Sequence, residues 1–241
     1  SIVYAVGLVR QILNEAKRRG VFVGDNPVSK VKAPKTDNRR QRFFTREEAG
    51  AILSELEHTD PEARELCLLS LHTGMRAGEI LKLRWGDIDP ARGALSIKDP
   101  KSGRNRFAYL TGPACEMLAA KRPGAPGALV FPSPTGKVRQ AVPRSIKAAI
   151  DKLGLNEGRE DRRDVAVFHT FRHTHASWLV QNGVGLFAVK EALGHATTQM
   201  AARYSHLAPE NLQATAKLFE AIAAKPAPEA APAAEEGGAR D

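Results

Sequence analysis

The chain has 241 residues and a formal net charge of +9, with an isoelectric point near 9.8. Its composition, 42% hydrophobic and 26% charged, is that of an ordinary globular protein with one or two domains. No apolar run approaches the roughly 18 residues that a membrane-spanning helix needs, so we expect no membrane protein and no membrane partner. The basic excess favours a polyanionic partner, and nucleic acid is the commonest one.

The first 42 residues are predicted to form a helix followed by a linker. Apolar side chains recur at helical spacing over residues 2–19, and Gly20 ends that run. One helix cannot bury its own apolar stripe, so residues 1–24 are expected to end a separate domain or to dock on the rest of the chain. Residues 25–42 contain two prolines and six basic residues, which are Lys30, Lys32, Lys35, Arg39, Arg40 and Arg42. From the residues alone, this linker is either a solvated connector or a segment that lies along phosphates.

A larger unit is predicted from Phe43 to residue 224, mainly helical with a small antiparallel β-sheet (α+β). Thr45 to Glu48 form a capping box before the first helix, and Pro61 opens the second. Two short strands are expected on either side of a turn, and the tail is rich in Ala, Pro, Glu and Gly, which predicts disorder. The expected segments are helices at 77–83, 112–121, 143–153, 170–182, 186–193, 197–203 and 209–223, strands at 94–98 and 106–110, and a disordered tail at 225–241.

Six polar side chains stand out by their positions at turns and helix ends. They are Arg76, Lys101, His169, Arg172, His195 and Tyr204. Each has an ordinary structural alternative when taken alone, such as an ion pair, a solvated turn, a helix cap or a half-buried aromatic anchor.

Metal binding is not expected from this sequence. His169 and His173 are four residues apart, which would allow shared ligation on one helix face, but no carboxylate or cysteine joins them at ligand spacing. Cys67 and Cys115 lie far apart among apolar residues, as reduced thiols of a cytoplasmic protein do. We therefore predict neither a metal nor a cofactor, and a cytoplasmic location.

Taken together and in order, these positions resemble the tyrosine recombinase, or phage integrase, family. The resemblance covers about residues 43–210, and the helix and linker before it fit the end of the family's core-binding domain. The matching strings are Thr73-Gly-Met-Arg-Ala-Gly-Glu-Ile-Leu-Lys-Leu-Arg-Trp, Pro100-Lys-Ser-Gly, His169-Thr-Phe-Arg-His-Thr, Leu193-Gly-His-Ala and Arg203-Tyr-Ser-His.

The resemblance implies a covalent, metal-independent mechanism of DNA strand exchange. Tyr204 would attack the scissile phosphate to give a 3′-phosphotyrosine and a free 5′-hydroxyl. Arg76 and Arg172 would bind the phosphate oxygens, Lys101 would protonate the leaving oxygen, and His169 would act as proton acceptor or donor. His195 would donate to a phosphate oxygen, and Glu79 would orient its neighbours without reacting.

The same resemblance implies the partners. They are double-stranded DNA at a specific site, whose phosphates the six basic linker residues would bind, further copies in a homotetramer that exchanges the helix near 211–223, and a directionality factor. The protein itself would be associated with the nucleoid. Three hypotheses stay open: an integrase that moves a mobile element, a related strand enzyme such as a dimer resolvase or a topoisomerase-like relaxer, and a DNA-binding protein without activity. The retention of all six polar positions disfavours the third hypothesis.

Overall fold

The computed structural model describes residues 2–32, 42–98, 105–208 and 220. The chain divides into two compact units, one of Ser1–Gln41 with Gly158–Val165 and one of Arg42–Glu157 with Ala166–Asp241. The second unit begins one residue before the predicted start at Phe43. The expected helix at 209–223 and the expected disordered tail at 225–241 fall outside the described residues, apart from residue 220.

The first unit contains helix α1, Ile2–Arg18, and the 3₁₀ helix η1, Pro27–Lys30. Asn26 connects the two: its side chain accepts a hydrogen bond from the Val28 amide and donates to the Arg10 carbonyl oxygen at 3.0 Å. The Arg10 guanidinium in turn donates to the Val31 carbonyl oxygen at 2.8 Å. The Asn-Pro pair that predicted a break in the chain therefore folds residues 26–31 back along α1.

The second unit is built around helices, and most of the predicted ones are confirmed within a residue or two. Their bounds are α2 Arg46–Thr59, α3 Pro61–Thr73, α4 Ala77–Leu81, α5 Gly112–Ala120, α6 Arg144–Lys152, α7 His169–Gln181, α8 Leu186–Leu193, α9 Thr198–Ala201, and the 3₁₀ helices η2 Trp85–Asp87 and η3 Ala202–Leu207. The predicted capping box of α2 is present, with reciprocal bonds between Thr45 and Glu48. None of the described helices has the length and apolarity to cross a membrane.

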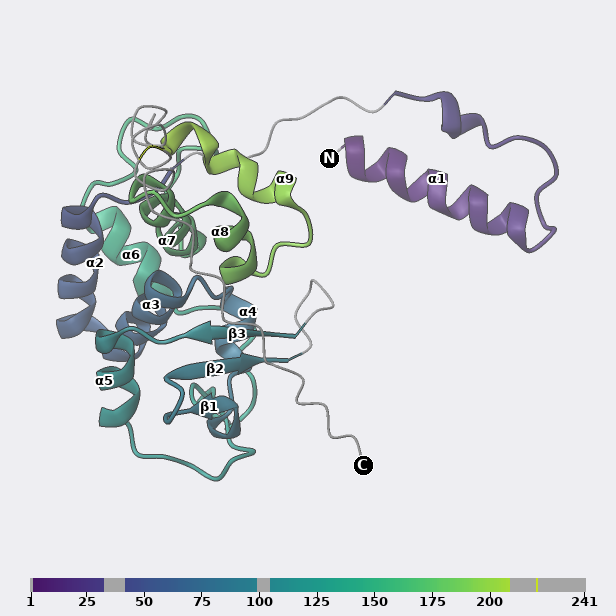
Figure 1. Cartoon of the computed structure of the whole chain (residues 1–241). Helices are drawn as coiled ribbons and strands as arrows, with labels where there is room; N and C mark the ends of the chain where they lie inside the picture. Colours follow the sequence, from purple (N-terminus) through teal and green to yellow (C-terminus); the bar gives the residue numbers. More distant parts are fainter. Residues whose placement is uncertain (1, 33–41, 99–104, 209–219, 221–241) are drawn as a thin grey trace, which may run out of the picture. The chain divides into compact units, whose positions relative to one another are not determined.

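The sheet has three antiparallel strands in the order β1-β2-β3, and it lies to one side of the helices (Figure 1). Strands β2, Ala94–Ile97, and β3, Arg106–Tyr109, were expected, and Leu95 pairs with Ala108. Strand β1, Ile88–Asp89, was not expected, because two residues inside a turn-rich sequence show no alternation. The predicted class, mainly helical with a small antiparallel sheet, is confirmed.

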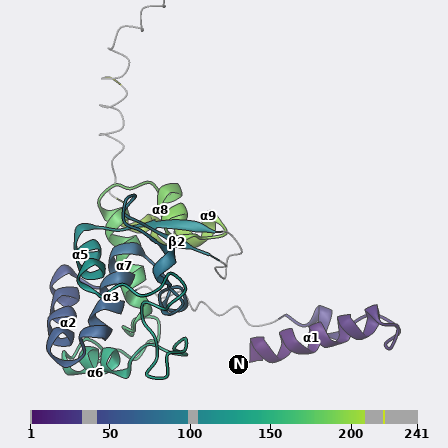
Figure 2. The same cartoon turned by 90° about the horizontal axis from the view of Figure 1, so that it is seen from below.

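Helix α3 lies at the centre of the second unit, where it packs against α2, α4, α5, α6 and α7. Seen from below, α3 and α7 run side by side within the unit (Figure 2). Both helices are buried on nearly all sides, so α7 buries polar residues such as Arg172 and His173 along with apolar ones. A second, smaller cluster joins the end of α7 to α8 and η3; its buried members are Ala176, Val180, Val189, Leu193 and Tyr204.

Candidate active site

Hydrogen bonds fix the backbone of the turn between α3 and α4, which carries Arg76. Gly74 ends α3 in the left-handed region, with φ of 65°, and its amide donates to the Ser70 carbonyl oxygen at 3.0 Å. The Ser70 hydroxyl donates to the Met75 carbonyl oxygen at 3.1 Å. A β-carbon at Gly74 would lie 2.7 Å from Leu193 Cδ2 and 2.9 Å from His175 Cδ2, so a larger residue would displace these side chains as well as strain the backbone. The turn therefore lies against the side chain of Leu193, at the end of α8.

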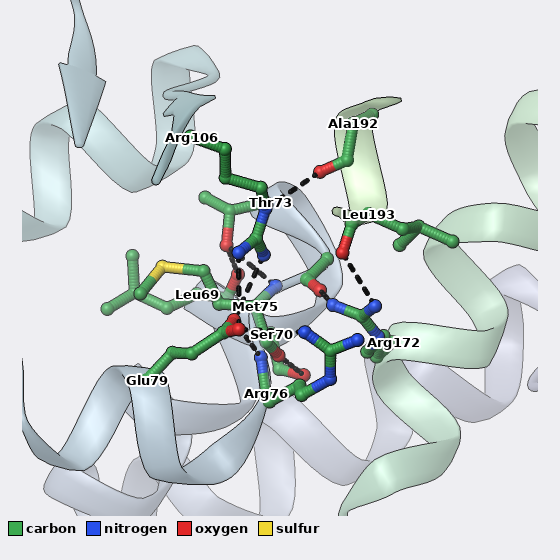
Figure 3. Close-up of polar contacts among 11 residues, drawn as sticks. Leu69, Ser70, Thr73, Met75, Arg76, Glu79, Arg106, Arg172, Ala192 and Leu193 are labelled. Atoms are coloured by element: carbon green, nitrogen blue, oxygen red, sulfur yellow. Dashed lines mark hydrogen bonds and ion pairs between the residues drawn. The ribbon is translucent and has the colours of Figure 1, made fainter. Parts of the chain in front are cut away.

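Glu79 binds two arginines that come from different elements (Figure 3). Its carboxylate accepts from the Arg76 amide at 2.9 Å and from Arg76 Nη1 at 2.8 Å. It also accepts two parallel bonds from Arg106 on β3, at 3.1 and 2.9 Å. Burial raises the pKa of Glu79, but the bonds and charges of Arg106 and Arg76 outweigh burial, and the net shift is downward. Glu79 is thus ionised at neutral pH, and its bonds hold the Arg76 side chain.

Arg172 is the most buried cation of the site, with 2% of its surface exposed. Its guanidinium donates to the carbonyl oxygens of Gly74 and Leu193, the latter at 2.7 Å, so it connects the α3–α4 turn to the end of α8. Burial, followed by the nearby charge of Arg76, lowers the pKa of Arg172 to about 9. The group still carries its charge at pH 7. Figure 3 shows the guanidinium groups of Arg76 and Arg172 turned toward the same space.

His195 follows Gly194, the left-handed cap of α8, and is held near the same cations. Burial and then the charges of Arg172, Arg76, Arg203 and Arg106 lower the pKa of His195 to about 3. Its Nδ1 atom is buried and has no hydrogen-bond partner within the described part of the chain. The imidazole is therefore neutral at pH 7, and it has hydrogen-bonding capacity left for a ligand.

Tyr204 lies in η3 with 5% of its surface exposed, and its hydroxyl is 2.7 Å from Nδ1 of His173 on α7. The His169 ring, at the start of α7, packs edge-on against the His173 ring, with 4.7 Å between the ring centroids. Burial raises the pKa of Tyr204, although the charges of Arg203 and Arg172 oppose that rise. The group in contact with the Tyr204 hydroxyl is thus His173.

The structure brings Arg76, Arg172 and His195 within electrostatic reach of one another, and Arg172 within reach of Tyr204. Lys101 lies outside the described residues. No group of three or more His, Cys, Asp or Glu side chains that could hold a metal ion occurs in residues 2–32, 42–98, 105–208 and 220.

The predicted DNA-binding residues of the linker divide into three cases. Lys35, Arg39 and Arg40 lie outside the described residues. Lys30 and Lys32 belong to the first unit and are exposed. Arg42 instead belongs to the second unit: its side chain is 12% exposed, and it forms an ion pair of 2.5 Å with Glu48 and covers the Phe44 ring.

Two residues of the site were missed as such in the sequence. Arg106 was assigned only to a strand, because nothing local distinguishes it from other basic strand residues. His173 was weighed only as a metal ligand, although its position next to Arg172 on α7 could have pointed to the site. Their contacts come from elements distant in sequence, namely Glu79 for Arg106 and Tyr204 for His173.

Comparison with known proteins gives a family match over most of the chain. The model of the phage integrase family matches residues 42–211. The integrase of Salmonella phage P22 is 29% identical over 232 residues, covering 90% of this chain and 56% of its own. The chain thus spans little more than half the length of that relative.

Solved structures resemble this fold at lower sequence identity. The catalytic domain of bacteriophage HP1 integrase superposes with a TM-score of 0.59 at 24% identity, covering 77% of this chain and 98% of that domain. The integrase of transposon Tn1549, in complex with transposon right end DNA, gives a TM-score of 0.64 at 16% identity over 91% of this chain and 85% of its own. These two likenesses support the fold alone.

Proposed function

We propose, because the chain belongs to the phage integrase family, that it is a site-specific DNA recombinase that cuts and rejoins strands. The strand would be held as a 3′-phosphotyrosine on Tyr204 between cutting and rejoining. The reaction would serve the integration or excision of a mobile element. Because the ester bond to tyrosine keeps the energy of the phosphodiester, rejoining to a new strand needs no external energy source.

The observation that carries this proposal is the excess of positive charge around Arg172. Burial lowers the pKa of Arg172 most, Arg76 and Arg106 lower it further, and Glu79 and Tyr204 raise it. Burial and then the same cations hold the His195 ring neutral, and its Nδ1 atom has no hydrogen-bond partner among the residues that the structure describes. Such a cluster is suited to a phosphate, since guanidinium groups bind its oxygens in a planar fork and stabilise the negative charge of the transition state. Preplaced cations lower the barrier without reorganising during the reaction.

Proton transfer in the proposed step runs from Tyr204 to His173. When His173 carries its own proton on Nε2, its Nδ1 accepts the hydrogen bond of the phenol at 2.7 Å. As the bond from Oη to phosphorus forms, the phenol proton passes to Nδ1, and the bond from phosphorus to the 5′ oxygen breaks. Lys101 would give its proton to that 5′ oxygen. His169, whose ring contacts that of His173, would support the proton acceptor His173 rather than contact Tyr204 itself.

Double-stranded DNA is the proposed partner, in line with the charge of the chain and with the DNA-bound Tn1549 integrase. Lys30 and Lys32, both exposed, would contribute phosphate contacts, and each contact would make binding weaker at higher salt. We further propose a homotetramer on DNA with exchange of the helix near 211–223, a directionality factor and association with the nucleoid. The family resemblance alone supports these last proposals.

The test of the nucleophile is capture of the covalent complex. Duplexes that tile the DNA flanking the gene, 5′-labelled and nicked just beyond each candidate cleavage position, are incubated with protein and separated under denaturing conditions. A short strand released at the nick cannot religate, so the labelled strand stays on the protein. Wild-type protein should retain label, and Tyr204→Phe should retain none, because the attacking oxygen is gone.

Tyr109→Phe is the matched control, since Tyr109 is an exposed tyrosine, 72% accessible, on strand β3. It should form adduct as the wild type does. An adduct with Tyr204→Phe would show that another residue is the nucleophile. Binding of these duplexes by the wild type with no adduct on any of them would refute strand cleavage and favour a DNA-binding role.

A further inference from the structure

Arg106 is buried at the junction of three elements of the candidate site. Its side chain is 8% exposed and forms a two-bond ion pair with Glu79, itself 7% exposed. Its Nε atom also donates, at a longer 3.4 Å, to the carbonyl oxygen of Ala192 in the last turn of α8. One guanidinium on β3 thus contacts both the carboxylate that orients Arg76 and the helix end that precedes His195 (Figure 3).

The backbone leaves space for this side chain. A β-carbon at Gly194 would lie 2.6 Å from Arg106 Cδ and 2.8 Å from its Nε. Gly194 has a φ of 61°, which glycine adopts without strain. The cap of α8, immediately before His195, is therefore shaped around the stem of Arg106.

Glu79 stays a carboxylate that faces Arg76 because two cations share it. Arg76 Nη1 and Arg106 Nη1 both bond to Oε1, at 2.8 and 3.1 Å, and Arg106 Nη2 takes Oε2 at 2.9 Å. Without Arg106, the buried Glu79 carboxylate would lose two of its four bonds and one of its two cations, and only Arg76 would still hold it. The Glu79 carboxylate and the Arg76 guanidinium bonded to it would then be less firmly fixed.

We propose that Arg106 is a positioning residue that keeps the side chains of Arg76 and His195 aligned so that both can bind one phosphate. It acts through Glu79 on the first group and through the end of α8 on the second. The inference rests on the proposed function, because it assigns a purpose to the alignment of those two groups. Small displacements of this kind matter, since an error of about 1 Å in a reacting geometry can cost about 10²-fold in rate.

The test compares Arg106→Gln, Arg106→Lys and Arg139→Gln. Arg139 is the matched control: it too bonds to a carboxylate, Glu62 at 2.6 Å, and to a backbone carbonyl, that of Pro132 at 3.0 Å. Adduct formation on a nicked duplex is timed at saturating protein, and duplex affinity is measured separately. Arg106→Gln should slow adduct formation by about 10²-fold with little change in duplex affinity. Arg106→Lys, which keeps the charge but not the fork, should recover part of the rate, and Arg139→Gln should match the wild type.

The route through Glu79 is tested by a double-mutant cycle. If Arg106 acts through Glu79, then Glu79→Gln combined with Arg106→Gln should be no slower than the worse single variant. Losses that multiply in the double variant would overturn that route. A wild-type rate in Arg106→Gln, or an equal loss in Arg139→Gln, would overturn the proposal as a whole.

Inorganic phosphate provides a readout that needs no cleavage. Its dissociation constant is measured by the shift of the His195 Cε1 proton in NMR spectra. Arg106→Gln should weaken phosphate binding by about tenfold, as expected for loss of charge-assisted bonds in a preorganised site, whereas Arg139→Gln should not. If the wild type binds phosphate in this way but forms no adduct, the proposed function fails while the positioning role stands. Unchanged phosphate binding in Arg106→Gln would refute the positioning role independently of cleavage.

Discussion

The hydrogen bond between His173 and Tyr204 allows a test of whether His173 accepts a proton or only packs against the tyrosine. Asparagine at 173 can place an amide atom near the position of Nδ1, so His173→Asn keeps a hydrogen-bond partner for the phenol but has no basic nitrogen. Phenylalanine at the same position removes both. The two variants therefore differ in the hydrogen bond and agree in the loss of the base.

The magnitudes follow from the burial of the pair, with Tyr204 at 5% and His173 at 6% exposed. Leaving a buried hydroxyl without a partner costs about 1–3 kcal/mol. For a domain of this size, 1 kcal/mol corresponds to about 2–4 °C in Tm. His173→Phe should therefore lower the Tm by about 2–12 °C, and His173→Asn by much less. Loss of a general base costs about 10²–10⁴ in rate, so both variants should form adduct at least about 10²-fold more slowly than the wild type.

The assay pairs thermal unfolding with the timed formation of the Tyr204 adduct. If His173→Asn is stable and cleaves within a few-fold of the wild type, His173 is not the proton acceptor. If it cleaves faster than the wild type, the bond to His173 restrains the nucleophile and must break before attack. Tyr204→Phe supplies the reference for stability, because it removes the same hydrogen bond from the other partner.

Two further predictions concern the end of α8. Gly194→Ala should destabilise the protein by about 1–3 kcal/mol more than Gly93→Ala, measured by urea unfolding. Both glycines have φ near +60°, but only the new β-carbon at position 194 would collide with Arg106. Equal losses of stability in the two variants would refute that packing. The His195 Cε1 proton should not titrate between pH 5 and 8 in the free protein, since the pKa is lowered to about 3. Because the unfolded chain then binds the extra proton between about pH 6.5 and 3, stability is lost as the pH falls through that window, and His195→Gln should lose less. Inorganic phosphate should raise the pKa of His195 in the same titration, and an unchanged pKa would contradict a phosphate site.

The elements that could be predicted from sequence are those whose cause is local. The capping box at Thr45, the proline at the start of α3 and the glycine after Thr73 each act within one turn of the chain. Strand β1 was missed because its pairing partner, not its own two residues, creates it. Long segments with a clear period or cap were therefore placed to within a residue or two.

The residues of the site also differ in whether local sequence or long-range packing determines their contacts. The resemblance selected six side chains, and the structure brings three of them, Arg76, Arg172 and His195, within electrostatic reach of one another. The sequence could not pair Tyr204 with His173, 31 positions away, or Arg106 with Glu79, 27 positions away. Such contacts depend on how α4, α7, α8 and β3 meet, and a single sequence does not specify that arrangement.

The end of α8 connects these separate contacts. Its last carbonyl groups accept from two cations at once, Leu193 from Arg172 and Ala192 from Arg106. A helix C-terminus carries partial negative charge, so it stabilises cations that would otherwise repel each other. The same helix belongs, through Leu193 and Val189, to the small apolar cluster that contains Tyr204. Movement of α8 would consequently change the alignment of Arg76 and Arg172 and the packing of Tyr204 together, so we expect the proposed cleavage to depend on the position of this helix.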